Sequence, residues 1–267
     1  MFKNYLNVAF RNITNHKLYS FINIIGLAFG LAACILIILF VKDELSYDQH
    51  WKNSDRLHRL NFTFNMPGRE PIAMSRAPGL AKDALQRFFA QEIDHATRFN
   101  SLNTVVISGN NNYSENITWT DPATAEMFDF DVIAGNMKKA LSDNSSLAIN
   151  QSLAEKYFSQ ENPIGQILTV KVEQLTRDFV IAAVFKDLPH NTVLNFSALA
   201  MIDEQDWSDS PWLFATWFSL NNSTYFSLKK NLSIESINNR LTNYINNNID
   251  IPAGAFGPSI NKASDFI

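Results

Sequence analysis

The longest apolar segment of the chain predicts a membrane-spanning helix near the N-terminus. Residues Leu18 to Val41 (LYSFINIIGLAFGLAACILIILFV) contain no charged residue and lie between Lys17 and Lys42. Roughly 20 helical residues cross the hydrocarbon layer of a bilayer, so this segment is long enough to span it with some tilt. We therefore predict one transmembrane helix over residues 18–41.

Residues 1–17 show a second pattern, in which apolar side chains recur at helical spacing. The apolar positions are Phe2, Tyr5, Leu6, Ala9, Phe10 and Ile13, and they lie opposite Lys3, Asn4, Asn7, Arg11 and Asn12. A helix with one apolar and one polar face is typical of segments that lie in the plane of the membrane interface. We predict a cytoplasmic interfacial helix over residues 1–17.

The charges divide sharply at the predicted span. Residues 1–41 contain Lys3, Arg11 and Lys17 and no acidic residue, so all 26 acidic residues of the chain follow the span. The basic end of a membrane helix stays in the cytoplasm by the positive-inside rule. We predict that the chain is held in a bacterial cytoplasmic membrane, with its N-terminus inside and residues 42–267 outside.

A lipoprotein signal is the main alternative for this start. Leu31-Ala32-Ala33-Cys34 has the residue types that precede a lipidated cysteine, but seven apolar residues follow Cys34. A cleavage site normally closes the apolar stretch, so we favour an uncleaved anchor over a membrane-anchored lipoprotein. Because the chain has one cysteine, it forms no internal disulfide.

Gly26, Gly30 and Cys34 recur at intervals of four residues within the predicted span. Small residues at this spacing share one helix face and allow another helix to approach closely, so these three are candidates for helix packing. The alternative is that glycine is simply frequent in membrane helices.

The rest of the chain alternates between strand-like and helix-like patterns without a low-complexity linker. We predict strands over residues 57–64, 96–108, 116–120, 146–150, 167–172, 177–185, 194–201 and 224–228. We predict helices over residues 78–89, after Pro122, over 152–158 and from Ser233 to Ile245. This mixture without regular repetition predicts an α+β fold, a two-lobed mixed α/β extracytoplasmic domain.

Motifs that carry catalysis are absent from the sequence. No GxxxxGK[ST] loop, HExxH, GxSxG or paired-cysteine spacing occurs, and the five histidines are scattered. We therefore predict no catalytic, metal or cofactor site and no enzyme activity. The acidic residues Asp121, Glu126, Asp129 and Asp131 fit no calcium loop, and we interpret 129–131 as a solvated strand edge.

Two further segments admit more than one interpretation. Asp187-Leu188-Pro189-His190 is better explained as a turn than as an acid/base pair. The tryptophans at 207, 212 and 217 fit either an exposed contact for a periplasmic partner or core packing.

Three ordered blocks resemble the MacB/FtsX-like ABC transporter permease family. The blocks are FKNYLNVAFRNITNHKLYSFINIIGLAFGLAACILIILFVKDELSYD, then DPATAEMFDFDVIAGNMKKAL with LAINQSLAEKYFSQENPIGQIL, and finally FVIAAVFKDLPHNTVLNF. The second block is the most specific, and it contains the signature turn Asn162-Pro163-Ile164-Gly165.

This resemblance implies a MacB-like extracytoplasmic core domain with a lobe inserted at roughly residues 105–220. It also implies three further membrane helices, so we expect the chain to be a fragment of a longer permease. The implied partners are a separate ABC ATPase, other permease helices or a second permease half, and a periplasmic partner, with no nucleic acid. The implied function is coupling of ATP hydrolysis to movements of the outer domain, for export or force transmission.

Two other functional classes fit the sequence less well. A single-span signalling receptor needs a cytoplasmic output domain, and only about 17 residues precede the span. A membrane-anchored hydrolase lacks a recognisable nucleophile or metal pattern.

Overall fold

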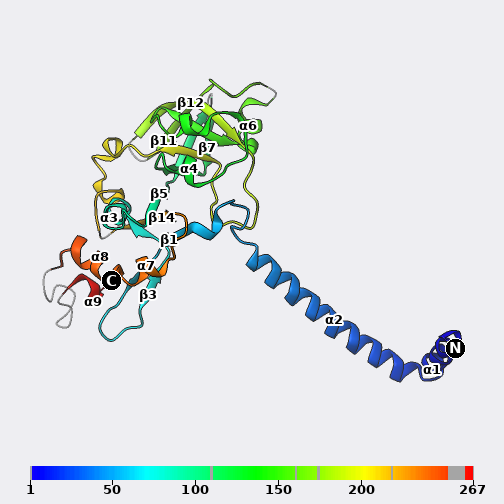
Figure 1. The fold of residues 1–267 in the computed structure, drawn as a ribbon. Helices are drawn as coiled ribbons and strands as arrows, with labels where there is room; N and C mark the ends of the chain where they lie inside the picture. Colours follow the sequence, from blue (N-terminus) through cyan, green and yellow to red (C-terminus); the bar gives the residue numbers. More distant parts are fainter. Residues whose placement is uncertain are drawn as a thin grey trace. The chain divides into compact units, whose positions relative to one another are not determined.

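The computed structural model describes residues 2–108, 111–159, 161–172, 175–217, 219–251 and 262–266. It divides into two compact units, Met1–His50 and Trp51–Ile267, whose elements are labelled in Figure 1. Residues 252–261, which include several Pro and Gly residues, lie outside the described residues.

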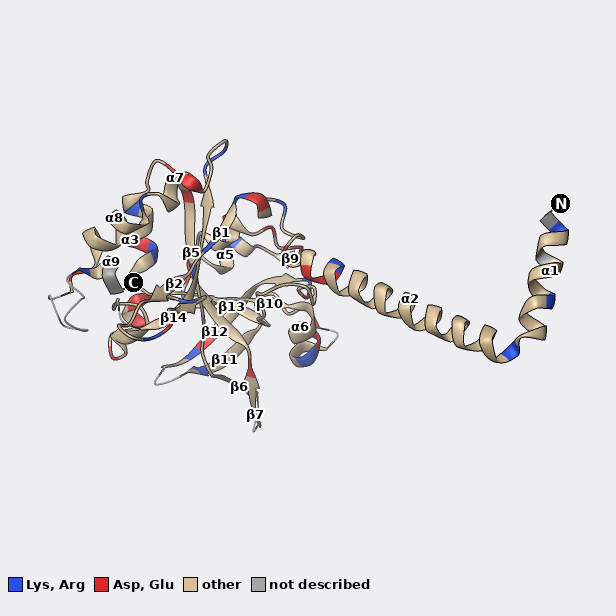
Figure 2. Cartoon of the chain, turned by 90° about the horizontal axis from the view of Figure 1, so that it is seen from below, with Lys and Arg blue, Asp and Glu red and all other residues tan. Residues whose placement is uncertain are grey.

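The N-terminal unit consists of two helices, α1 (Phe2–Asn15) and α2 (Lys17–Leu45). His16 separates them, because its backbone leaves the helical conformation at φ −114° and ψ 55°. Helix α2 has 29 residues and a mean hydropathy of 3.0 in its most apolar window, and none of that window is buried. Figure 2 shows charged residues only toward the two ends of α2. The helix is therefore long and apolar enough to cross a membrane, and it extends beyond the predicted 18–41 at both ends.

The second unit is built around a large mixed sheet. Its strands are β1 (Leu57–Leu60), β2 (Phe62–Phe64), β3 (Ile72–Met74), β4 (Ala77–Pro78), β5 (Ile93–Ser101), β6 (Thr104–Ser108), β7 (Asn111–Glu115), β8 (Ile117–Thr120), β9 (Val132–Gly135), β10 (Ser146–Asn150), β11 (Ile167–Val172), β12 (Leu175–Phe185), β13 (Ala198–Met201) and β14 (Leu220–Leu228). Its α-helices are α3 (Ala81–Phe88), α4 (Thr124–Met127), α5 (Met137–Ala140), α6 (Gln151–Phe158), α7 (Glu235–Asn238), α8 (Leu241–Asn248) and α9 (Ala263–Phe266).

The strands of the main sheet follow the order β1-β14-β5-β8-β13-β10-β12-β11-β6-β7, with β4 beside β14 and β9 beside β12. β10 pairs with β12 in parallel and β13 with β8 in parallel, whereas the other pairs are antiparallel. Strands β2 and β3 form a separate hairpin. The mixed α/β fold class predicted from the sequence is confirmed.

The sheet order groups strands according to their place in the chain. β1, β14 and β5 occupy one end, and the strands between residues 104 and 201 occupy the other. One apolar core contains Trp119, Phe179 and Ile181, and another contains Phe89 and Tyr244. The sheet continues from one group to the other, so the predicted lobe boundaries near 105 and 220 stay predictions.

Three predicted strands are shorter or broken in the structure. The strand predicted over 96–108 is divided because β5 pairs with β14 and β8, whereas β6 pairs with β11 and β7. The strand predicted over 57–64 is also divided, because β2 leaves the main sheet to pair with β3. The strand predicted over 194–201 begins only at Ala198, although Leu194 and Phe196 are buried against the core.

Two predicted helices also differ in their bounds. Pro78 belongs to β4 and not to the first turn of a helix, because α3 begins at Ala81. The closing helix is interrupted between Asn238 and Leu241, where Arg240 forms an ion pair with Glu92. The apolar side chains of this segment nevertheless pack against the core: Ile234, Ile237, Leu241, Tyr244 and Ile245.

Candidate functional site

Helix α2 presents the predicted packing residues on an open face. Gly26, Gly30 and Cys34 are all exposed. A Cβ atom added at Gly26 or Gly30 meets no atom within 4 Å outside the helix's own backbone. The described residues therefore leave this face free for another helix, and side chains larger than glycine would limit how closely that helix approaches.

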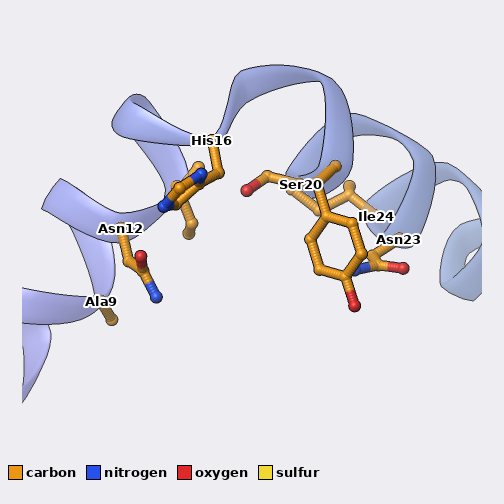
Figure 3. A pocket seen from close by; sticks show the side chains of 8 residues that line it. Ala9, Asn12, His16, Ser20, Asn23 and Ile24 are labelled. Atoms are coloured by element: carbon orange, nitrogen blue, oxygen red, sulfur yellow. The ribbon is translucent and has the colours of Figure 1, made fainter.

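A hollow of about 770 Å³ lies in the bend between α1 and α2, and Figure 3 shows side chains from both helices around it. Its polar side chains are Asn12, His16, Ser20 and Asn23. The backbone continues through the bend, since His16 N donates to Asn12 O and Ser20 N donates to His16 O. The bend therefore gathers polar groups at the basic end of the apolar helix.

The predicted signature turn links α6 to β11 and is held by backbone hydrogen bonds. Asn162 Oδ1 accepts from Ile164 N at 3.1 Å, and Gln166 N donates to Pro163 O at 3.0 Å. Gly165 has φ +86°, a conformation that favours glycine, and its N donates to Ile181 O at 2.9 Å. Residues 162–165 thus form a turn in the structure, and the hydrogen bond from Gly165 secures it to β12.

A buried cluster of charged residues, which no local sequence pattern predicted, connects segments that are distant in the sequence. Arg98 on β5 forms two side-chain hydrogen bonds with Asp121, from Nη2 to Oδ1 at 2.7 Å and from Nε to Oδ2 at 3.1 Å. Lys82 Nζ lies 3.0 Å from Asp121 Oδ1, and Glu204 Oε1 accepts from Arg98 Nη1 at 2.9 Å. Only 3% of the Arg98 side chain and 8% of the Asp121 side chain are exposed.

The electrostatics of this cluster keep Asp121 ionised. Burial acts to raise the pKa of Asp121, but the charge and hydrogen bonds of Arg98, together with Lys82, lower it below its usual range. Burial likewise acts to lower the pKa of Arg98, and its acidic neighbours raise it overall. Asp121 is therefore a paired, buried carboxylate that joins the end of β8 to β5 and α3.

Comparison of the sequence with known protein families assigns the chain to a family. A family model described as the MacB-like periplasmic core domain matches residues 20–244. The chain belongs to this family. The MacB-like domain therefore spans all the main-sheet strands and begins within α2.

Solved structures resemble the MacB-like domain of this chain. A domain of a protein described as a permease from Porphyromonas gingivalis is 25% identical, with a TM-score of 0.60 over 76% of this chain and 85% of that one. The periplasmic region of MacB from Actinobacillus actinomycetemcomitans is 15% identical, with a TM-score of 0.47 over 69% and 81% of the two chains. The extracellular domain of the noncanonic ABC-type transporter YknZ from Gram-positive bacteria is 14% identical, with a TM-score of 0.43 over 67% and 88%. Comparison with curated proteins gave no match.

Membership of this family indicates what kind of domain the chain contains. It contains a MacB-like periplasmic core domain over residues 20–244. Together with the apolar helix α2, this describes a membrane-anchored chain whose main domain is extracytoplasmic.

Three of the four acidic residues considered as calcium ligands pair with separate lysines. Glu126 contacts Lys138 at 3.0 Å, Asp129 contacts Lys52 at 2.9 Å, and Asp131 contacts Lys186. Residues 128–131 are not a strand, which corrects the interpretation of 129–131 as a strand edge. Phe128 is buried and Phe130 packs against the same core, as predicted. Within the described ranges, no group of three metal-ligating side chains is present.

The remaining candidates of the MacB-like domain have structural roles. Asp187 Oδ2 accepts from Ser152 Oγ at 2.7 Å, so it supports the start of α6. Trp207 is buried with its ring 5.6 Å from that of Trp119, whereas half of Trp212 is exposed.

His58 on β1 is a partly buried titratable group. Partial burial lowers the pKa of His58, and the charge of Asp55 acts in the opposite direction.

Proposed function

We propose that this chain is the anchored outer domain of a permease subunit whose movements are driven by a separate ABC ATPase. The observation that carries this proposal is the family match over residues 20–244, because it joins most of α2 and the outer domain in one family unit. In this account α2 crosses the membrane with Lys3, Arg11 and Lys17 inside, following the positive-inside rule.

The chain itself is non-catalytic in this proposal. The sequence lacks the glycine-rich loop whose backbone amides, lysine and hydroxyl hold a nucleotide with magnesium. A single apolar helix also cannot enclose a polar path, because its whole surface faces lipid unless other helices pack against it. ATP hydrolysis and the transport path therefore come from other chains or helices.

Helix α2 provides the connection between the two sides of the membrane. It is continuous from Lys17 to Leu45, so a displacement of its basic end can reach the residues that precede the outer domain. The small residues Gly26, Gly30 and Cys34 are the face on which partner helices pack in this proposal.

The experiment compares two double variants of α2 in the complete permease, reconstituted with its ATPase. Gly26→Leu with Gly30→Leu closes the small-residue face, and Ala28→Leu with Ala32→Leu places two leucine side chains on the opposite face, since successive residues turn by about 100°. We expect the glycine variant alone to uncouple ATP hydrolysis from substrate export, because helix packing is weakened.

Two results would contradict the proposal. Equal coupling in both double variants would remove the glycine face from the mechanism. ATP hydrolysis by the purified 267-residue chain would disprove the non-catalytic assignment.

A further inference from the structure

A polar cleft of about 240 Å³ crosses four neighbouring strands of the main sheet, β1, β14, β5 and β8. Its floor is made by side chains that directly oppose one another on paired strands: Arg59 with Tyr225, Ser223 with Phe99, and Ser101 with Thr118. Directly opposed residues project from the same face of a sheet, so the floor is one continuous face.

Two segments outside these strands complete the cleft. Ser75 and Arg76 precede β4 and line one side. Residues 193–196 precede β13 and line another, where the ring of Phe196 stacks on that of Phe99 at a centroid distance of 5.9 Å. The cleft is thus assembled from four strands and two further segments, and Phe99 in its floor belongs to the buried core.

The lining of the cleft carries positive charge without a carboxylate. Arg59 and Arg76 are its charged residues, and no Asp or Glu lines it. Arg59 Nε donates to Asn61 Oδ1 at 3.1 Å, and within the part of the chain that is described neither arginine forms an ion pair. Four other arginines of the domain form ion pairs, Arg56 with Asp94, Arg98 with Asp121, Arg177 with Asp206 and Arg240 with Glu92, whereas Arg69 and Arg87 form none among the described residues.

Hydroxyl groups supplement the two arginines. Ser101 Oγ and Thr118 Oγ1 lie 2.7 Å apart on the floor, and Ser75 and Ser223 also line the cleft. One guanidinium suffices to bind both oxygens of a carboxylate, whereas a phosphate group carries more acceptor oxygens and uses donors from several directions. The combination of two arginines with surrounding hydroxyls therefore favours a phosphate group.

We propose that this cleft binds a phosphate-type oxyanion, either inorganic phosphate or the phosphate of a larger head group. The volume is smaller than the roughly 300–1,000 Å³ of sites that enclose drug-sized ligands, so the phosphate occupies the cleft and any larger substituent extends outside it. The cleft is lined by β1, β14 and β5 from one end of the sheet and by β8 from the group between residues 104 and 201. The bound anion therefore lies where these two groups of strands meet. The site is independent of the coupling proposed above.

The test measures binding of radiolabelled inorganic phosphate to the full chain in neutral detergent by equilibrium dialysis. We expect saturable binding of about one phosphate per chain, weakened roughly tenfold or more by Arg76→Ser and by Arg59→Gln, because each removes charge-assisted hydrogen bonds. Arg69→Ser is the matched control, since Arg69 is also exposed but does not line the cleft. Circular dichroism confirms that each variant is folded.

Competition experiments identify the source of the oxyanion. If glycerol phosphate displaces the label much more strongly than inorganic phosphate, the site takes a head group; if both compete equally, it takes free phosphate. The proposal is overturned if wild type shows no saturable binding or if the double variant Arg59→Gln with Arg76→Ser binds like wild type. Acetate competing as strongly as phosphate also overturns it, because the site is then selective for no phosphate chemistry.

Discussion

At the scale of single residues, the buried pair of Arg98 and Asp121 makes a strong stability prediction. Asp121→Asn leaves the buried Arg98 guanidinium without its main counter-charge, and breaking such a pair typically costs about 3–5 kcal/mol. Glu204→Gln is the control, because half of the Glu204 side chain is exposed and such pairs contribute about 1 kcal/mol or less. Urea unfolding followed by tryptophan fluorescence measures both, and equal midpoints would contradict the structural role of Asp121.

The same carboxylate predicts how stability depends on pH. Burial opposes ionisation of Asp121, but Arg98 and Lys82 lower its pKa below the unfolded value of about 3.9. This contribution to stability is present above that value and is lost as pH falls through the lower, folded pKa. We expect the free energy of unfolding to decrease in wild type below about pH 4, and to decrease less steeply in Asp121→Asn. Parallel slopes for the two proteins would show that Asp121 does not titrate in this way.

At the scale of elements, the signature turn depends on the backbone conformation of Gly165. With φ at +86°, an alanine at this position is strained by about 1–2 kcal/mol, although the space around an added Cβ is open. We expect Gly165→Ala to destabilise the domain and Gly165→Asn to be less damaging, since asparagine tolerates positive φ better. Thermal unfolding compares the two variants, and a neutral alanine variant would show that the turn relaxes without strain.

The elements also show which patterns a sequence reveals. The apolar helix and α6 depend on patterns among neighbouring residues, and the structure has helices at both places. Strand β7, Asn111–Glu115, was missed because it lies at the edge of the sheet, where its mainly exposed polar side chains produce no hydrophobic alternation. Strand β3 was missed for a similar reason, since all of its residues are exposed.

At the scale of the whole molecule, long-range pairing accounts for what the sequence did not reveal. Arg98 and Asp121 meet because β5 pairs with β8, and the polar cleft forms because β14 returns between β1 and β5. Local periodicity contains no information about such partners. Trp207 and Trp212 are a second example. They lie five residues apart, yet Trp207 is buried in the core and Trp212 is exposed, and no local pattern distinguishes them.

We propose that α2 holds the sheet-containing unit from Trp51 onward outside the membrane, with the N-terminus inside. Cys34 is the one cysteine of the chain, so a Cys34→Ser background allows labelling at single introduced cysteines. Lys3→Cys and Arg69→Cys provide a matched pair of exposed positions before and after α2.

The measurement is reaction of these two variants with a membrane-impermeant maleimide in intact spheroplasts and again after permeabilisation. If α2 has the proposed orientation, position 69 is labelled in intact spheroplasts and position 3 is labelled only after permeabilisation. Labelling of position 3 in intact spheroplasts, with position 69 protected, would contradict it.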